Sequence, residues 1–283
     1  MIATGILLAF MAATASAFAL VLQAQEARGT SRAYAGRFAL LGLLLRRRRW
    51  VFGTALLVLA WPLQILALSF APLTVVQPVL ATFQLILVAI ARFQLKCAIG
   101  AREWLGALAV TAGVALVIVA APHRTVAHPP ALRVAIPLVL VGGGTLIAYA
   151  IGRWKPSSGL LVAFAAGLGY AWVDFADKLV SNSFAVGDVV AGIVWLLAVG
   201  SFGAIAFLEE NTALQRRSPV QVAPVIGAIQ EPLPVLMALA AGLEVWSGGV
   251  TRLAGLAAGL LLAGVGATVL ARSSAAARVA AQR

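Results

Sequence analysis

Apolar runs of about 20 residues recur from one end of this 283-residue chain to the other. A run of that length crosses a bilayer as an α-helix, because the hydrocarbon layer is about 30 Å thick and a helix rises about 1.5 Å per residue. Hydrophobic residues make up 62% of the chain and charged residues 11%, whereas soluble domains carry about a quarter charged residues. The pattern predicts an all-α polytopic membrane protein.

Nine segments qualify as transmembrane helices. They lie at 2–22, 51–70, 72–91, 104–122, 133–152, 159–178, 188–208, 218–241 and 251–271. The first contains Ala-Ser-Ala at 15–17, which resembles a signal-peptidase site. Its start carries no positive charge and its apolar run is long, so we interpret it as an uncleaved helix.

The basic residues predict the orientation. With the N-terminus outside, 17 Lys and Arg residues fall on the cytoplasmic side and 4 on the outer side, as the positive-inside rule requires. We therefore expect a multi-pass protein of the cell (inner) membrane with a cytoplasmic C-terminus. The net charge of +12 is assigned to loops that meet anionic lipid head groups, and no nucleic-acid partner is expected.

The segment 33–45 is apolar but only 13 residues long, and it leads into four arginines at 46–49. Its length favours a surface helix or a short hairpin over part of a tenth span. We interpret the basic run as a topology determinant.

Two short matches in the same order indicate an internal repeat. GILLAFMA at 5–12 resembles GLLVAFAA at 159–166, and APLTVVQPV at 71–79 resembles SPVQVAPV at 218–225. Because five spans separate the two starting points, the second copy crosses the membrane upside down, as in many secondary transporters. We expect two inverted four-helix repeats joined by a connecting helix. The corresponding units are 1–122 (spans 1–4, with the cytoplasmic basic loop 23–50), 123–157 (span 5), 158–272 (spans 6–9) and 273–283 (a cytoplasmic tail).

Glu231 is the one acidic residue near the middle of a predicted span. A central carboxylate costs roughly 2.5–3.5 kcal/mol on insertion scales, so it is expected to face a wet cavity or a partner, or to be protonated. One interpretation is a neutral acid hydrogen-bonded to a neighbouring helix. The interpretation we favour is recognition of a substrate amine or coupling to protons.

Four prolines are candidates for helix breaks. Pro78 and Pro224 each lie about six residues into a span, and Pro232 and Pro234 follow Glu231. A broken helix beside a buried carboxylate suits a transport site at the membrane midplane. The alternative is a set of kinks that only shape helix packing.

Other candidates for solute contact are neutral: Gln64, Gln77, Gln84, Gln230 and Trp61. Gln84 and Gln230 take equivalent places in the two repeats. The alternative for the glutamines is a hydrogen bond that links two helices, and for Trp61 a large side chain that fills a gap.

The remaining acidic residues are assigned to the membrane surfaces. Asp177, near the outer end of span six, is a candidate for attracting a cation, whereas Asp174 is expected to pair with Lys178 on the surface. Glu209 and Glu210 are placed with nearby arginines in a solvated inner loop.

Enzymatic chemistry is not expected. His123 and His128 lack the spacing of a metal site, and the single Cys97 excludes an internal disulfide. No paired carboxylates are expected within a span, and no cofactor or resident metal is predicted. Glycines at 142–144 and the pair Gly255/Gly259 favour close helix packing.

Three stretches carry a family resemblance: APLTVVQPVLAT at 71–82, REWLGALAVTAGVAL at 102–116, and ALQRRSPVQVAPVIGAIQEPLPVL at 213–236. With them, nearly the whole chain resembles the drug/metabolite transporter (DMT) superfamily, in particular EamA-like permeases and NIPA-like magnesium transporters. These motifs specify a fold better than a substrate. Leu95–Lys96–Cys97 stands where the family usually carries Leu-Gly-Glu, which Gly242–Leu243–Glu244 approximates in the second half. Nine spans suit the NIPA-like group better than the ten usual in EamA-like permeases.

The expected function is a secondary transporter that moves a small organic metabolite or drug-like solute by alternating access. Proton coupling and a homodimer are further hypotheses. One alternative is a NIPA-like transporter of magnesium or another divalent cation, with Asp177 and Glu231 involved. Another is a membrane scaffold or accessory subunit that transports nothing.

Overall fold

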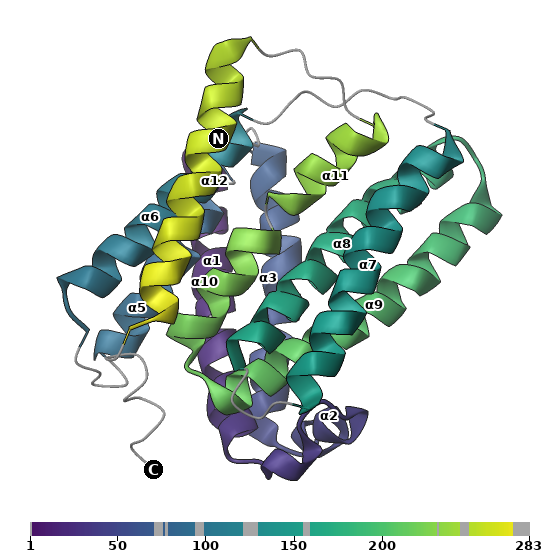
Figure 1. The fold of residues 1–283 in the computed structure, drawn as a ribbon. Coiled ribbons are helices and arrows are strands. Elements are labelled where there is room, and N and C mark those ends of the chain that lie inside the picture. Colours follow the sequence, from purple (N-terminus) through teal and green to yellow (C-terminus); the bar gives the residue numbers. More distant parts are fainter. Residues whose placement is uncertain are drawn as a thin grey trace.

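The computed structural model describes residues 2–70, 76, 79–93, 99–120, 130–154, 159–230, 232–243 and 249–273. Over these ranges all regular structure is helical (Figure 1). The helices are α1 (Ile2–Arg28), η1 (Arg32–Tyr34), α2 (Phe38–Leu44), α3 (Arg48–Phe70), α5 (Phe83–Phe93), α6 (Ala101–Ala120), α7 (Ala131–Trp154), α8 (Gly159–Ala185), α9 (Val189–Arg216), α10 (Pro219–Gln230), α11 (Leu233–Ala241) and α12 (Val250–Ala271).

Five of these helices are long and apolar enough to cross a membrane: α1, α7, α8, α9 and α12. Large apolar side chains such as Leu140, Val190 and Leu197 are exposed on them, which suits a hydrocarbon solvent, where a helix satisfies its own backbone hydrogen bonds. The chain is therefore a helical membrane protein, as its composition predicts.

The other four predicted spans overlap helices over the residues that the structure describes. The segment 51–70 falls within α3, and 104–120 falls within α6, while 72–91 and 218–241 overlap the shorter apolar helices Val79–Phe93 and Pro219–Gln230. Three helices run well beyond their predicted ends: α1 continues to Arg28, α8 to Ala185 and α9 to Arg216.

The segment 33–45 forms a short helix at the lower end of the bundle (Figure 1). Helix α2 has seven residues, too few to cross a bilayer. The preceding turn is held by Gly36, whose N–H donates to Thr212 Oγ1 at 3.1 Å and whose carbonyl accepts a hydrogen bond from the Tyr149 hydroxyl. This contact fastens the segment to α7 and α9.

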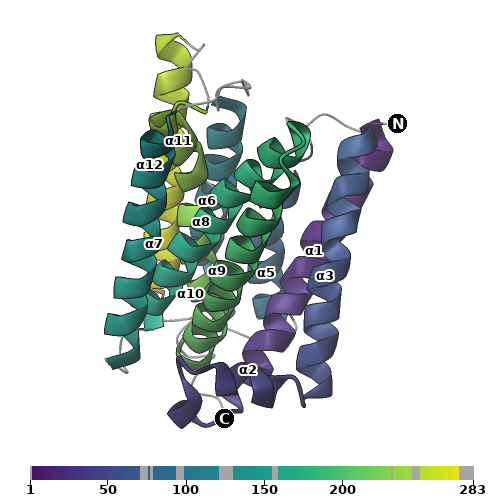
Figure 2. The ribbon, with the colours of Figure 1, turned by 90° about the vertical axis from the view of Figure 1, so that its right-hand side faces the viewer.

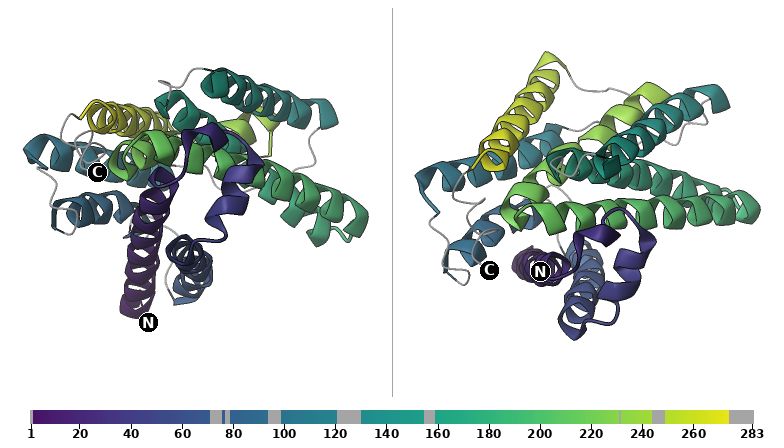
Figure 3. Two further views of the ribbon diagram at one scale, coloured as in Figure 1. Left: turned by 90° about the horizontal axis from the view of Figure 1, so that it is seen from below. Right: turned by 60° about the horizontal axis from the view of Figure 1, so that its bottom comes forward.

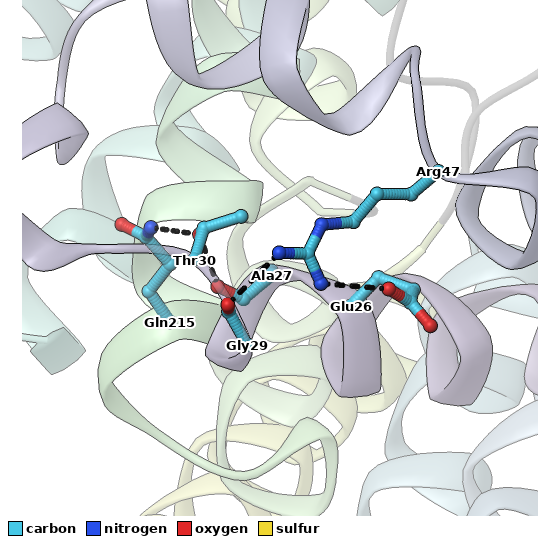
Figure 4. A network of polar contacts seen from close by, with 6 residues as sticks. All are labelled: Glu26, Ala27, Gly29, Thr30, Arg47 and Gln215. Carbon is cyan, nitrogen blue, oxygen red and sulfur yellow. Dashed lines mark hydrogen bonds and ion pairs between the residues drawn. The ribbon is translucent and has the colours of Figure 1, made fainter.

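A polar network at the same end joins α1, the chain before α3, and α9 (Figure 4). Arg47 donates from Nη1 to Glu26 Oε2 and from Nη2 to the Gly29 carbonyl, both at 3.0 Å. Gln215 Nε2 donates to Thr30 Oγ1 at 2.6 Å. One arginine of the basic run thus fixes local structure.

The helices pack mainly in three pairs: α1 with α3, α8 with α9, and α6 with α12. Helix α10 lies among them and contacts α8, α12, α5 and α6, as the view from below indicates (Figure 3). The start of α1 and the end of α12 lie at opposite ends of the bundle (Figure 2).

Glycines bring α6 and α12 into backbone contact. A Cβ added to Gly113 would lie 2.4 Å from the backbone nitrogen of Ala263, and one added to Gly259 would lie 2.8 Å from the Gly113 carbonyl oxygen. Gly259 thus has the close packing predicted for it. No neighbouring atom lies within 4 Å of the corresponding position at Gly143.

Candidate functional site

A cavity of about 650 Å³ lies where the two halves of the chain meet. Its walls come from α1, α3, the chain around the start of α5, α6, α8, α9 and α10. Its polar and aromatic lining residues are Ser16, Gln23, Trp61, Gln64, Phe83, Gln84, Asp174, Glu210 and Gln230. The lining contains two carboxylates and no Lys or Arg from the part of the chain that the structure describes.

The two carboxylates are held by neutral donors. Gln230 Nε2 donates to Asp174 Oδ2 at 3.2 Å, which connects α10 with α8. The Tyr170 hydroxyl donates to Glu210 Oε2 at 2.6 Å, which connects α8 with α9. Neither the amide nor the phenol donor brings a positive charge, so these contacts orient the two carboxylates and are compatible with a cationic or hydrogen-bond-donating ligand.

Gln84 adds an unsatisfied acceptor to the same cavity. Its side chain is only 7% exposed, and its Oε1 has no hydrogen-bond partner among the described residues. A buried acceptor without a partner is unfavourable, and a ligand N–H would relieve it.

Trp61 stands at the side of the cavity and is 70% exposed, so it does not fill a gap between helices. A second hollow of about 500 Å³ adjoins the first and shares Ser16, Leu57, Trp61, Gln64 and Leu80 with it. The remaining residues of this second hollow are Ala12, Val58 and Ala60. The polar cavity therefore has an apolar annex between α1 and α3.

Four of the sequence-predicted candidates meet in the cavity: Trp61, Gln64, Gln84 and Gln230. Asp177 lies on α8 three residues beyond Asp174, is exposed, and is not part of the cavity lining. Glu231, Gln77 and Pro78 lie outside the described residues.

The proline positions differ in effect. Helix α10 ends at Gln230 and α11 begins at Leu233, with Pro232 at the N-cap and Pro234 in the first turn of α11. Pro224, in contrast, is buried inside a continuous α10, so the chain is not broken there. The neighbouring helices cover α10 at this point, and one missing backbone donor is tolerated within such packing.

The solvated-loop assignment of Glu209 and Glu210 was wrong. Glu209 and Glu210 lie within α9 rather than in a solvated loop. Glu209 is fully buried and Glu210 lines the cavity. Asp174 also lines the cavity, so two carboxylates share one site within the bundle, which the sequence analysis did not expect. The available signal was the stretch 209–216, which holds no glycine or proline to end the helix.

Among the described residues, no group of three or more His, Cys, Asp or Glu side chains lies close enough together to hold a metal ion. The site consists of a negatively lined polar cavity with an apolar annex.

Comparison of the chain with family models, with curated proteins and with solved structures found no match.

Proposed function

We propose that the protein is a secondary transporter of the cytoplasmic membrane that moves a small cationic organic solute by alternating access. The observation that carries this proposal is the cavity itself, whose described lining combines Asp174, Glu210 and the unsatisfied Gln84 Oε1 and includes no Lys or Arg. A solute with an ammonium or guanidinium group would add a positive charge beside Glu210 and a donor for the Gln84 Oε1 acceptor.

The arrangement of the helices supports an inverted repeat of the drug/metabolite transporter type. Helix α1 packs on α3 as α8 packs on α9, while α5 contacts α6 as α10 contacts α12. Helices α1 and α8 run in opposite directions through the bundle (Figure 1). The cavity then lies at the interface of the repeats, where transporters of this plan bind their substrates.

The interruption between α10 and α11 supports a moving part near the site. Gln230, the last residue of α10, holds Asp174 by a hydrogen bond. A change of angle between the two short helices would alter this contact directly. Glu231 follows Gln230 in sequence and stays a candidate for amine recognition or proton coupling.

The divalent-cation alternative also has an observation in its favour. Asp174 and Glu210 line one cavity, and Mg²⁺ is commonly held by one or two protein carboxylates together with several waters. A non-transporting scaffold is the remaining alternative, for which the cavity would have no ligand.

Thermal unfolding of the purified protein distinguishes these functions. A ligand that binds the folded state raises the midpoint by mass action. We expect an organic amine to stabilise the wild type and the Asp177→Asn control, and to stabilise Asp174→Asn and Glu231→Gln less. Stabilisation by Mg²⁺ alone would support the divalent-cation alternative. No effect from either ligand class would contradict transport and favour the scaffold.

A further inference from the structure

Glu209 is a buried carboxyl group that the cavity does not use. Its side chain is 0% exposed, and neither Oε1 nor Oε2 has a hydrogen-bond partner within the described ranges. The next residue, Glu210, accepts a hydrogen bond from Tyr170 and lines the cavity. Adjacent carboxyl groups on α9 therefore have opposite environments.

The elements that pack against α9 include α8, α1, α10 and α2. The ionisable side chains of helix α8 are Tyr170, Asp174, Asp177 and Lys178. Tyr170 is hydrogen-bonded to α9, and Lys178 lies about two turns farther along α8. Helix α1 contributes Arg28, whose guanidinium donates to the carbonyls of Leu214 and Arg217. On α9 itself, Arg216 donates to the Gly152 carbonyl. Helices α2 and α10 contain no ionisable side chain.

An ionised carboxylate in this position would be strongly destabilising, because it has lost its water and gained neither a donor nor a cation. The neutral acid removes this penalty, and its retained proton is the simplest charge compensation available. We propose that Glu209 is a proton-binding site, neutral in the resting protein, whose proton exchanges with the cavity through Tyr170 and Glu210. The proton-binding role of Glu209 is argued from its burial and its lack of hydrogen-bond partners among the described residues. A role of this proton in driving transport rests on the function proposed above.

Tyr170 is placed to connect the two carboxyl groups. Its hydroxyl donates to Glu210, the residue next to Glu209 on α9. When the Glu209 side chain turns toward it, the Tyr170 oxygen accepts the acid's proton while its own proton passes to the Glu210 carboxylate. The step converts Glu209 to a carboxylate and Glu210 to a neutral acid, and the net charge is unchanged. A cation that enters the cavity favours release of that proton because it repels positive charge near Glu210.

Infrared spectroscopy of the full chain in lipid nanodiscs at neutral pH tests the proton site without any substrate. The wild-type minus Glu209→Gln difference spectrum should contain the carbonyl band of one protonated carboxylic acid. The matched control Glu26→Gln removes a carboxylate paired with Arg47 and should lose carboxylate bands instead. Carboxylate bands in the Glu209 difference spectrum would overturn the proposal.

Thermal unfolding of the Glu209 variants shows whether the substitutions themselves disturb folding. A neutral, unpartnered acid makes no hydrogen bond that its replacement would lose, so Glu209→Leu and Glu209→Gln should both fold, with melting midpoints close to the wild-type value. Failure of both to fold, while Glu26→Gln folds normally, would show that the carboxylate has a stabilising partner and would contradict a proton site.

Deuterium exchange tests the route. After transfer to D₂O, the carbonyl band of Glu209 should shift as the acid proton exchanges, and Tyr170→Phe should slow this shift by about tenfold or more. An unchanged exchange rate in Tyr170→Phe would remove Tyr170 from the route. Because these measurements need no transported solute, they can fail while the transport proposal survives, and the reverse also holds.

Discussion

The contact between α6 and α12 and the cavity beside α8, α9 and α10 are built on opposite principles. In the first, glycines remove side chains so that two backbones touch, with 2.4 Å between a Cβ added to Gly113 and the Ala263 nitrogen. In the second, polar side chains face about 650 Å³ of space and keep an unused acceptor on Gln84. The difference suggests a rigid frame next to an adaptable site.

This division has a consequence for how each region responds to mutation. Dispersion and close packing hold membrane helices together, because lipid is as apolar as the side chains it replaces. A change at the glycine contact should therefore act on stability, whereas a change in the cavity should act on ligand affinity. The predictions below separate the two, from the largest expected effect to the smallest.

Gly113→Ala is expected to have the largest effect. The new methyl group would meet the backbone of Ala263 and Gly259, which cannot turn aside as a flexible side chain can, so we expect a loss of about 3 kcal/mol in unfolding free energy. Gly264→Ala on α12 is the matched control, because no atom lies within 4 Å of its added Cβ. Unfolding in detergent measures both, and equal losses in the two variants would contradict the backbone contact.

Glu210→Gln should leave stability nearly unchanged and weaken binding of a cationic solute roughly ten- to hundredfold. The amide oxygen can still accept from Tyr170, but the anion is lost, and a hydrogen bond to a charged group contributes about 1.5–3 kcal/mol. Titration calorimetry with an organic amine measures the dissociation constant, with Glu26→Gln as the control. The same dissociation constant in both variants would remove Glu210 from the site.

The same substitution at two glutamines, one in the cavity and one in a contact that links α10 to the end of α12, separates effects on affinity from effects on stability. Gln84→Leu deletes an unsatisfied acceptor in the cavity, so solute affinity should fall by about fivefold, equivalent to about 1 kcal/mol. Gln221→Leu deletes donors to the carbonyls of Ala271 and Ser273, at 3.1 and 3.4 Å. It should lower the melting midpoint instead and leave affinity unchanged. Calorimetry measures solute affinity and thermal unfolding measures stability for both variants. A loss of affinity in Gln221→Leu but not in Gln84→Leu would contradict the prediction.

Glu103 should give the smallest effect, a stabilising contribution that disappears in acid. It lies one residue before the predicted span 104–122. Burial raises the pKa of its carboxyl, but hydrogen bonds from Ser273 Oγ and the Gly100 N–H outweigh burial and hold the pKa below the usual value of 4.5. A lowered pKa in the folded state means that the ionised group stabilises the fold above about pH 4.5 and that this contribution is lost as the pH falls further. Unfolding of wild type and Ser273→Ala between neutral and acid pH should therefore converge in acid, and a constant difference would contradict the assignment.

The helical fold was predictable from sequence because length and hydropathy alone decide whether a segment is apolar enough to span a bilayer. The repeat match also pointed to Gln84 and Gln230, which both line the cavity. Glu210 was missed because the hydropathy signal fades before α9 ends at Arg216. Asp174 was missed because sequence does not reveal which face of α8 meets α10, and the Gly113–Gly259 contact joins helices far apart in the chain.

Uptake into proteoliposomes tests the central claim most directly. Wild type, Asp174→Asn and Asp177→Asn would be compared for uptake of the organic amine that gives the largest thermal stabilisation, with equal amounts of inserted protein. We predict uptake by wild type and Asp177→Asn, and loss of most uptake in Asp174→Asn, because only Asp174 lines the cavity. Equal uptake by Asp174→Asn and wild type would contradict the assignment of this cavity as the transport site.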